Sequence, residues 1–217
     1  TDPVRRGRVV FIAPKSRNFE AAVHPADAAA TSRADKGKHR HHVFEFRDLP
    51  AITSEPGMPG YGEVAAFVAA STLGDANAVA AWYRELVGPQ MDAGPAVVAE
   101  AQKLAAGAVE LADKVERLHA FVARRVRYVG LEFGEHGYKP YRVDDIYARR
   151  FGDCKDKASL LKAMLEAVGV DSHMVLVRTR RLGRVSVVSP SVFDHAILYV
   201  PAVDRYLDAT APFHGVG

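Results

Sequence analysis

The order of the predicted helices and strands in the second half of the chain constrains its fold most. Three stretches carry apolar side chains at helical spacing: residues 95–106, 110–126 and 154–168. Three stretches typical of strands follow them: residues 172–180, 193–201 and 205–209. Because the helices come first and the strands lie together at the end, the sequence predicts an α+β fold with an antiparallel sheet.

The first part of the chain has a different pattern, rich in β-branched and aromatic residues. Residues 8–12 and 41–47 are predicted strands, and residues 64–71 alternate weakly as a further strand. Residues 26–38 are polar and rich in alanine, and they are predicted to form a loop or the tip of a hairpin. Asp75 is a favourable N-cap for a helix that follows it.

A linker is predicted between these two parts. Residues 49–62 hold three prolines and three glycines. Since two strands do not make a stable sheet alone, residues 1–70 are predicted to be the C-terminal part of a β-rich domain plus its linker. Residues 71–217 are predicted to form the second domain. The chain, which begins at Thr1, is therefore expected to be a piece of a longer protein.

Charge and cysteine content exclude several classes of protein. The 217 residues include 29 Lys and Arg against 26 Asp and Glu, and the basic residues are scattered, so nucleic acid is not an expected partner. No apolar run approaches the roughly 18–20 residues needed to span a membrane. The only cysteine, Cys154, excludes an internal disulfide and zinc sites built from cysteine pairs.

Cys154 lies where a helix can activate a thiol. Asp153 is a favourable N-cap, so Cys154 falls in the first turn, where unpaired amides and the helix dipole favour an anion. A thiolate is such an anion, and the same amides can donate to the oxyanion that forms on an attacked carbonyl. The alternative is structural, because Cys154 also lies on an apolar helical stripe, where a cysteine is commonly a small buried hydrophobic residue.

A nucleophilic thiol needs a base and a group that orients the base. His195 lies near the start of a predicted strand, and Asp208 lies on the next one. If the two strands form a hairpin about Val203, His195 and Asp208 become cross-strand neighbours on one face of the sheet. The alternatives are a structural histidine and an ordinary turn carboxylate.

Three motifs resemble one family when they are taken together in this order. They are Gly152-Asp153-Cys154, Asp194-His195-Ala196 and Leu207-Asp208-Ala209-Thr210. They resemble the transglutaminase-like superfamily of papain-like cysteine enzymes. Residues 152–158 and the loop at 128–140 are similar to one bacterial subgroup, in which a β-rich domain of unknown function precedes the core. The resemblance implies a core in which the nucleophile helix packs on an antiparallel sheet.

The resemblance also implies roles for individual residues. Cys154 would be the nucleophile, His195 the general base and then acid, and Asp208 the group that orients the imidazole. Candidates for the substrate cleft or for oxyanion stabilisation are Tyr128, Gly152, Asp153 and Tyr138. No cofactor and no metal are implied.

The chain departs from the family pattern at several positions. Asp194 stands where the subgroup often has Asn, Tyr206 where it commonly has Trp, and Ala209 where it commonly has Pro. None of these changes removes a catalytic atom. Animal transglutaminases stabilise the oxyanion with a tryptophan, but Trp82 lies in another predicted helix and is expected in the core. The second oxyanion donor is therefore unassigned.

The resemblance implies thiol-dependent acyl transfer on amide or peptide substrates of the glutamine type, through a thioester. Hydrolysis, as in a protease, and crosslinking, as in a transglutaminase, both remain open. A non-enzymatic protein-binding module that keeps the fold is the alternative. A third reading is an enzyme that works only inside the longer protein. The expected partner is a protein or peptide substrate, the expected location is periplasmic or envelope-associated, and no oligomeric state is predicted.

Overall fold

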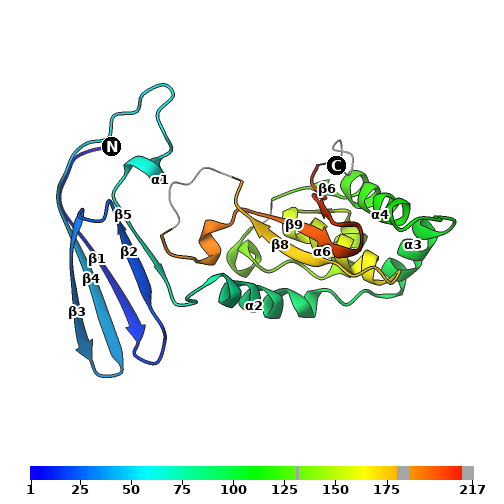
Figure 1. Cartoon of the computed structure of the whole chain (residues 1–217), viewed down its shortest axis with the longest axis horizontal. Coiled ribbons are helices and arrows are strands. Elements are labelled where there is room, and N and C mark those ends of the chain that lie inside the picture. The colour runs from blue at the N-terminus through cyan, green and yellow to red at the C-terminus, as the bar shows by residue number, and fades with distance from the viewer. Residues whose placement is uncertain (131, 180–185, 212–217) are drawn as a thin grey trace. The chain divides into compact units, whose positions relative to one another are not determined.

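The computed structural model describes residues 1–130, 132–179 and 186–211 (Figure 1). The chain divides into two compact units. One comprises Thr1–Ala81 and Arg180–Phe193, and the other comprises Trp82–Thr179 and Asp194–Gly217. The boundary after residue 70, which separates a β-rich domain from the second domain, stays a prediction.

The first unit is built mainly from antiparallel strands. One sheet has the order β1-β4-β3, and a second pair joins β2 to β5. Their bounds are β1 (Val4–Pro14), β2 (Glu20–His24), β3 (Ala29–Lys36), β4 (His39–Leu49) and β5 (Phe67–Ser71), with the short helix α1 (Tyr61–Val64) before β5. The strands predicted at residues 8–12 and 41–47 are confirmed within β1 and β4. The strand predicted at residues 64–71 is confirmed only from Phe67 on, because Val64 is the last residue of α1.

The loop predicted at residues 26–38 is wrong, because β3 occupies most of it. β3 pairs with β4 along its whole length, from Ala29 opposite Phe46 to Lys36 opposite His39. It is an edge strand, and all but its first residue are exposed. An exposed edge strand is held by backbone hydrogen bonds and carries no alternation of buried and exposed residues that a sequence could reveal.

The second unit combines helices with a three-stranded sheet, and the predicted α+β fold is confirmed. The helix α2 (Ala76–Val87) spans the boundary between the two units along the chain. It begins after Asp75, whose carboxylate accepts a hydrogen bond from the Ala78 amide at 2.8 Å. The remaining α-helices are α3 (Pro95–Ala105), α4 (Leu111–Arg125), α5 (Val143–Arg149) and α6 (Cys154–Glu166). The three helices predicted in this region are confirmed as α3, α4 and α6.

The sheet of the second unit is antiparallel, with the order β10-β9-β8. Its strands are β8 (His173–Val177), β9 (His195–Val200) and β10 (Arg205–Leu207), and a short parallel pair joins β6 (Arg127–Tyr128) to β7 (Phe151–Gly152). All three predicted strands are confirmed, although each is shorter than predicted. The last residue of the first predicted strand, residue 180, lies outside the described residues.

The helix α6 forms the centre of the second core. It contacts β9 on one side and α3, α4 and α5 elsewhere, and Figure 1 shows it beside the sheet. Its fully buried apolar side chains include Leu160, Leu161, Met164 and Leu165. Burial of each such side chain contributes about 1.5–3 kcal/mol, so this packing fixes the helix firmly. The expected packing of the nucleophile helix on an antiparallel sheet is confirmed.

Gly169 lies just beyond the end of α6. Gly169 has a φ of 76°, a left-handed conformation that favours glycine, and the Val170 amide donates to the Leu165 carbonyl at 2.9 Å. Within the described part of the chain, no helix combines the length and apolarity needed to cross a membrane.

Candidate active site

The segment that leads into α6 is held by a short parallel strand pair. Tyr128 in β6 pairs with Gly152 in β7, and the Val129 amide donates to the Gly152 carbonyl at 2.9 Å. A Cβ added at Gly152 would lie 2.6 Å from the Cβ of Asp156. Only glycine therefore fits here, and this close approach brings the entering strand against the first turn of α6.

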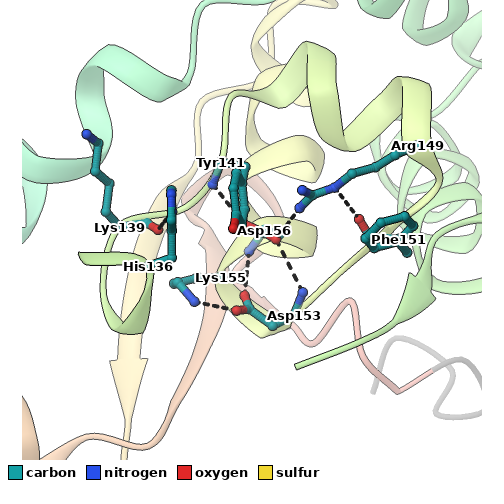
Figure 2. A network of polar contacts seen from close by, with 8 residues as sticks. All are labelled: His136, Lys139, Tyr141, Arg149, Phe151, Asp153, Lys155 and Asp156. Atoms are coloured by element: carbon teal, nitrogen blue, oxygen red, sulfur yellow. Dashed lines mark hydrogen bonds and ion pairs between the residues drawn. The ribbon is translucent and has the colours of Figure 1, made fainter. Parts of the chain in front are cut away.

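A capping box then starts the helix at Cys154. The Asp153 carboxylate accepts from the Asp156 amide at 3.2 Å, and the Asp156 carboxylate accepts from the Asp153 amide at 3.4 Å. Lys155 also pairs with the Asp153 carboxylate (Figure 2). The predicted N-cap is confirmed, and the buried Asp153 side chain acts as a helix cap. The amides of Cys154 and Lys155 take no part in the box and belong to the unpaired first turn.

Cys154 itself is the first residue of α6 and its side chain is only 8% exposed. It is a free thiol. The helix dipole and the first-turn amides at this position favour a negative charge. Local structure therefore gives Cys154 the surroundings that were predicted from the sequence.

His195 and Asp208 meet at the other side of the site. The His195 Nε2 donates to the Asp208 Oδ2 at 2.9 Å. The second carboxylate oxygen, Oδ1, accepts from the Thr210 amide at 2.8 Å and from the Thr210 hydroxyl at 2.7 Å. Both oxygens of Asp208 are thus engaged, and this fixes the direction of its hydrogen bond with the imidazole.

The hairpin register places His195 and Asp208 on one face of the sheet. Leu207 pairs with Leu198, so Asp208 follows the end of β10 and is two residues away from direct pairing with His195. An even shift keeps side chains on the same face of a sheet. His195 and Asp208 are thus cross-strand neighbours on one face, as predicted, and their side chains reach each other diagonally.

The electrostatics of this pair favour its charged form. The hydrogen bond to Asp208, followed by the one to the Cys154 thiol, raises the pKa of His195 to about 10 despite burial. Burial raises the pKa of Asp208, but hydrogen bonds from His195 and Thr210 outweigh it and lower that pKa to about 2. The raised pKa of His195 and the lowered pKa of Asp208 therefore favour an imidazolium beside a carboxylate at neutral pH.

Three residues that support the site were not found from the sequence. The buried His119 in α4 donates from Nε2 to the Asp208 backbone carbonyl at 2.8 Å. The buried Lys157 donates to the carbonyls of Ala123 at 3.2 Å and Val126 at 2.7 Å, at the end of α4. Thr210 had a usable signal, since a hydroxyl residue two positions after an aspartate commonly closes a turn. His119 and Lys157 had none.

The remaining predicted cleft residues occupy different surroundings. Tyr128 is 50% exposed and lies beside Gly152 in the strand pair. The Tyr138 ring lies 5.6 Å from the ring of Trp82, edge to face. Trp82 is half-buried rather than a core residue. The described contacts therefore group Tyr128 with the segment that leads into Cys154, and Tyr138 with Trp82.

Asp194, the first family departure, accepts hydrogen bonds from the amide of Thr179 at 2.7 Å and from its hydroxyl at 3.0 Å. This contact fixes the chain just before His195. Among the described residues, no group of three His, Cys, Asp or Glu side chains is arranged to hold a metal ion.

Comparisons with known proteins agree with this geometry. The sequence profile of the transglutaminase-like superfamily matches residues 99–201, which include Cys154 and His195. A structure from Parabacteroides distasonis, of a protein proposed to be a protease, has a TM-score of 0.77 at 18% identity, covering 94% of this chain. Only 40% of that structure is covered, so the chain spans less than half of its length. No curated protein matches the chain.

Two further solved structures are more distant. One is a proposed cysteine protease from Cytophaga hutchinsonii, with 14% identity, a TM-score of 0.44, and coverage of 96% of this chain and 73% of that one. The other is the periplasmic domain of TgpA from Pseudomonas aeruginosa, with 17% identity, a TM-score of 0.39, and coverage of 97% and 74%. The profile match and the shared fold of the first structure lead to one conclusion. Residues 99–201 are similar to the transglutaminase-like superfamily, and the chain shares the fold of the Parabacteroides structure.

Proposed function

We propose that the chain catalyses thiol-dependent acyl transfer on amide or peptide substrates of the glutamine type. Cys154 is the nucleophile, His195 the general base and then acid, and Asp208 the group that orients the imidazole. The observation that carries the proposal is the hydrogen bond of 2.9 Å between His195 and Asp208. It is supported by the pKa of His195, which Asp208 and then Cys154 raise. Catalytic triads share this arrangement, in which a base lies between a nucleophile and a carboxylate that orients the base.

The first half of the reaction forms a thioester. Because Asp208 engages Nε2 of His195, Nδ1 is the ring nitrogen that holds the proton of the thiol in the imidazolium, which leaves Cys154 as the attacking thiolate. The Cys154 sulfur attacks the carbonyl carbon, and the carbonyl oxygen becomes an oxyanion. His195 then returns the proton to the leaving nitrogen, the carbon–nitrogen bond breaks, and an amine or ammonia departs.

The second half releases the acyl group. Water or a primary amine gives a proton to His195 and attacks the thioester carbon. The carbon–sulfur bond breaks, and the proton returns to the sulfur of Cys154. Water yields a carboxylic acid, as in a hydrolase or protease, and an amine yields a new amide, as in a transglutaminase. No cofactor is needed for either route.

The oxyanion needs donors in both halves. The Cys154 amide is the first, because it lies at the unpaired start of α6. For the second donor we favour Tyr128, which lies beside Gly152 immediately before the nucleophile. Asp153 is disfavoured, since its carboxylate already accepts from Asp156 and Lys155.

Acylation by an activated ester of a glutamine-like acid tests the proposal. The protein is mixed with the ester, quenched in acid and weighed by mass spectrometry. Wild type is expected to carry one acyl group on Cys154, and His195→Ala to acylate about 100- to 10,000-fold more slowly. His173→Ala is the matched control, since His173 is an exposed histidine of β8 that also lies near an aspartate, at 3.8 Å. It should acylate like wild type.

The fate of the acyl group separates the two activities. Loss to water alone indicates a hydrolase, and transfer to an added primary amine indicates a transglutaminase. If wild type and His195→Ala acylate equally slowly, the triad does not operate. The alternative of a protein-binding module is then favoured, and the low exposure of the Cys154 side chain, 8%, is the observation consistent with it.

The proposal also covers the substrate and the cellular location. The substrate is a protein or peptide, and the location is periplasmic or envelope-associated, as the family resemblance implies. Since this chain spans less than half of the Parabacteroides structure, contacts from the rest of a longer protein are expected to complete substrate binding.

A further inference from the structure

The carboxylate of Asp156 joins three segments around the nucleophile. Its Oδ1 accepts from the Tyr141 amide at 2.9 Å, and its Oδ2 accepts from Arg149 at 2.8 Å and from the Asp153 amide at 3.4 Å (Figure 2). Tyr141 lies before α5, Arg149 is the last residue of α5, and Asp153 precedes Cys154. One side chain therefore ties α5 and the loop before it to the residues that position the thiol.

This carboxylate is buried, and its charge needs compensation. Burial and then repulsion from Asp153 raise the pKa of Asp156, while the Tyr141 amide, Lys155 and Arg149 lower it. Lys155 is engaged by Asp153, so Arg149 is the cation that contacts Asp156 directly. Without that cation, the negative charge of Asp156 has no direct counterion beside Cys154.

Arg149 is itself held in one orientation. Its guanidinium carbon lies 4.1 Å from the centre of the Tyr141 ring and 4.8 Å from that of Phe151. Its Nε donates to the Phe151 carbonyl at 2.9 Å, while Nη2 reaches Asp156. The Tyr141 ring in turn stacks on His136 at 3.8 Å. A planar guanidinium can make these contacts at the same time, and an ammonium cannot.

The charges around the thiol make this arrangement relevant to reactivity. Two carboxylates within the first turn of α6 disfavour a thiolate at Cys154 unless each is paired with a cation. Lys155 pairs with Asp153, and Arg149 pairs with Asp156. Among the described residues, Tyr83 and His195 also interact electrostatically with Cys154, and Asp208 interacts with His195.

We propose that Arg149 is a positioning residue for Cys154 and that it acts through Asp156. It holds the segment 152–154 in place and balances the carboxylate charge beside the thiol. The proposal deepens the proposed function and rests on Cys154 being the nucleophile. Arg149 itself need not touch the substrate.

The pH dependence of Cys154 alkylation by iodoacetamide tests this role without a substrate. Cys154 is the only cysteine, so the label reports on this residue alone. In Arg149→Gln, the pH midpoint of alkylation is expected to rise by about one unit, because an uncompensated carboxylate opposes the thiolate. The alkylation rate at neutral pH should fall about tenfold. Arg149→Lys keeps the charge and should recover part of the shift.

Arg150→Gln is the matched control. Arg150 is the next residue, and its guanidinium also lies over two rings, at 5.1 Å from Phe121 and 4.0 Å from Tyr147. Among the described residues it forms no ion pair with α6, so its midpoint should match wild type. Equal midpoints for Arg149→Gln and Arg150→Gln, both confirmed as folded by circular dichroism, would overturn the proposal. If Arg149→Gln does not fold, the alkylation midpoints of Arg149→Lys and Arg150→Lys are compared instead. A higher midpoint for Arg149→Lys supports the proposal, and equal midpoints overturn it.

A double-variant cycle tests whether Arg149 acts through Asp156. In an Asp156→Asn background there is no carboxylate to compensate, so Arg149→Gln should shift the midpoint by much less than in wild type. An equal shift in both backgrounds would show that Arg149 acts on the thiol independently, against the proposal. This test is also distinguishable from the test of the triad. If His195→Ala acylates as fast as wild type, the triad fails whatever the alkylation midpoint of Arg149→Gln. If the midpoint of Arg149→Gln equals that of wild type, the role of Arg149 fails whatever the acylation rate of His195→Ala.

Discussion

His119 in α4 donates a hydrogen bond to the backbone carbonyl of Asp208 at 2.8 Å, although 89 residues separate the two in the sequence. The contact fixes the main chain of Asp208, and Thr210 fixes its side chain. The orienting carboxylate of the proposed triad is therefore held from two directions, by a helix and by its own turn. This relationship gives the site a rigid side opposite the nucleophile helix.

His119→Leu is expected to destabilise the protein through this contact. The substitution leaves the Asp208 carbonyl without its buried donor, which should lower the free energy of unfolding by about 1–3 kcal/mol. His119→Gln keeps an N–H donor and should lose less. Urea denaturation measures both, with the exposed His173→Leu as control. A loss in His119→Gln as large as in His119→Leu would show that the ring, rather than the hydrogen bond, is what matters.

The His195–Asp208 pair should make stability depend on pH in a defined window. The pKa of His195 is raised from 6.5 to about 10, so its contribution is complete below pH 6.5 and is lost as pH rises through about 10. The pKa of Asp208 is lowered from 3.8 to about 2, so its contribution is complete above pH 3.8 and is lost as pH falls through about 2.

The difference in melting temperature between wild type and His195→Gln should therefore be largest near about pH 5 and shrink toward about pH 10. Thermal melts across this range measure it. A difference that stays constant with pH would mean that the pair is not charged in the folded protein.

The sequence was sufficient for those features that depend on local pattern. The helix α6 was predicted from its apolar spacing, and its start was predicted from Asp153. The shared face of His195 and Asp208 followed from strand alternation, which survives an even slip in register. The strand β3 was missed because it is an exposed edge strand without an apolar period.

Buried polar residues whose partners come from distant elements were not predictable. Lys157 stands beside other charged residues at the start of α6. Nothing in this local sequence indicates that its ammonium group reaches the carbonyls at the end of α4. The role of Arg149 depends on two rings and a carboxylate from three segments. Such contacts arise only from tertiary packing, and a single sequence carries no local signal for them.

Tyr83→Phe should leave the protein equally stable or make it more stable. The side chain of Tyr83 is 4% exposed, and its hydroxyl has no hydrogen-bond partner among the described residues. An unsatisfied buried hydroxyl costs about 1–3 kcal/mol, so its removal recovers part of that cost. Tyr199→Phe is the matched control, since its hydroxyl donates to Asp204 at 2.8 Å and its loss should not stabilise. A lower melting temperature for Tyr83→Phe would indicate a partner for the hydroxyl, such as an ordered water.

Gly152→Ala should disrupt the entry to α6. The added methyl group would lie 2.6 Å from the Cβ and 2.7 Å from a carboxylate oxygen of Asp156, so the strand or the first helical turn must move. Crowding of this kind costs about 1–3 kcal/mol, and the movement should also weaken the contacts of Asp156 with Tyr141 and Arg149.

Gly137→Ala provides the comparison for that variant. At Gly137 the nearest atom to an added methyl is the Glu132 carbonyl oxygen at 4.0 Å, so its free energy of unfolding should change by less than about 0.5 kcal/mol beyond the propensity difference. Denaturant unfolding measures stability, and iodoacetamide labelling measures the exposure of Cys154 in the same samples. Gly152→Ala should lose stability and also change the labelling rate. Equal behaviour of the two variants would mean that the close approach of Gly152 to Asp156 does not position the nucleophile.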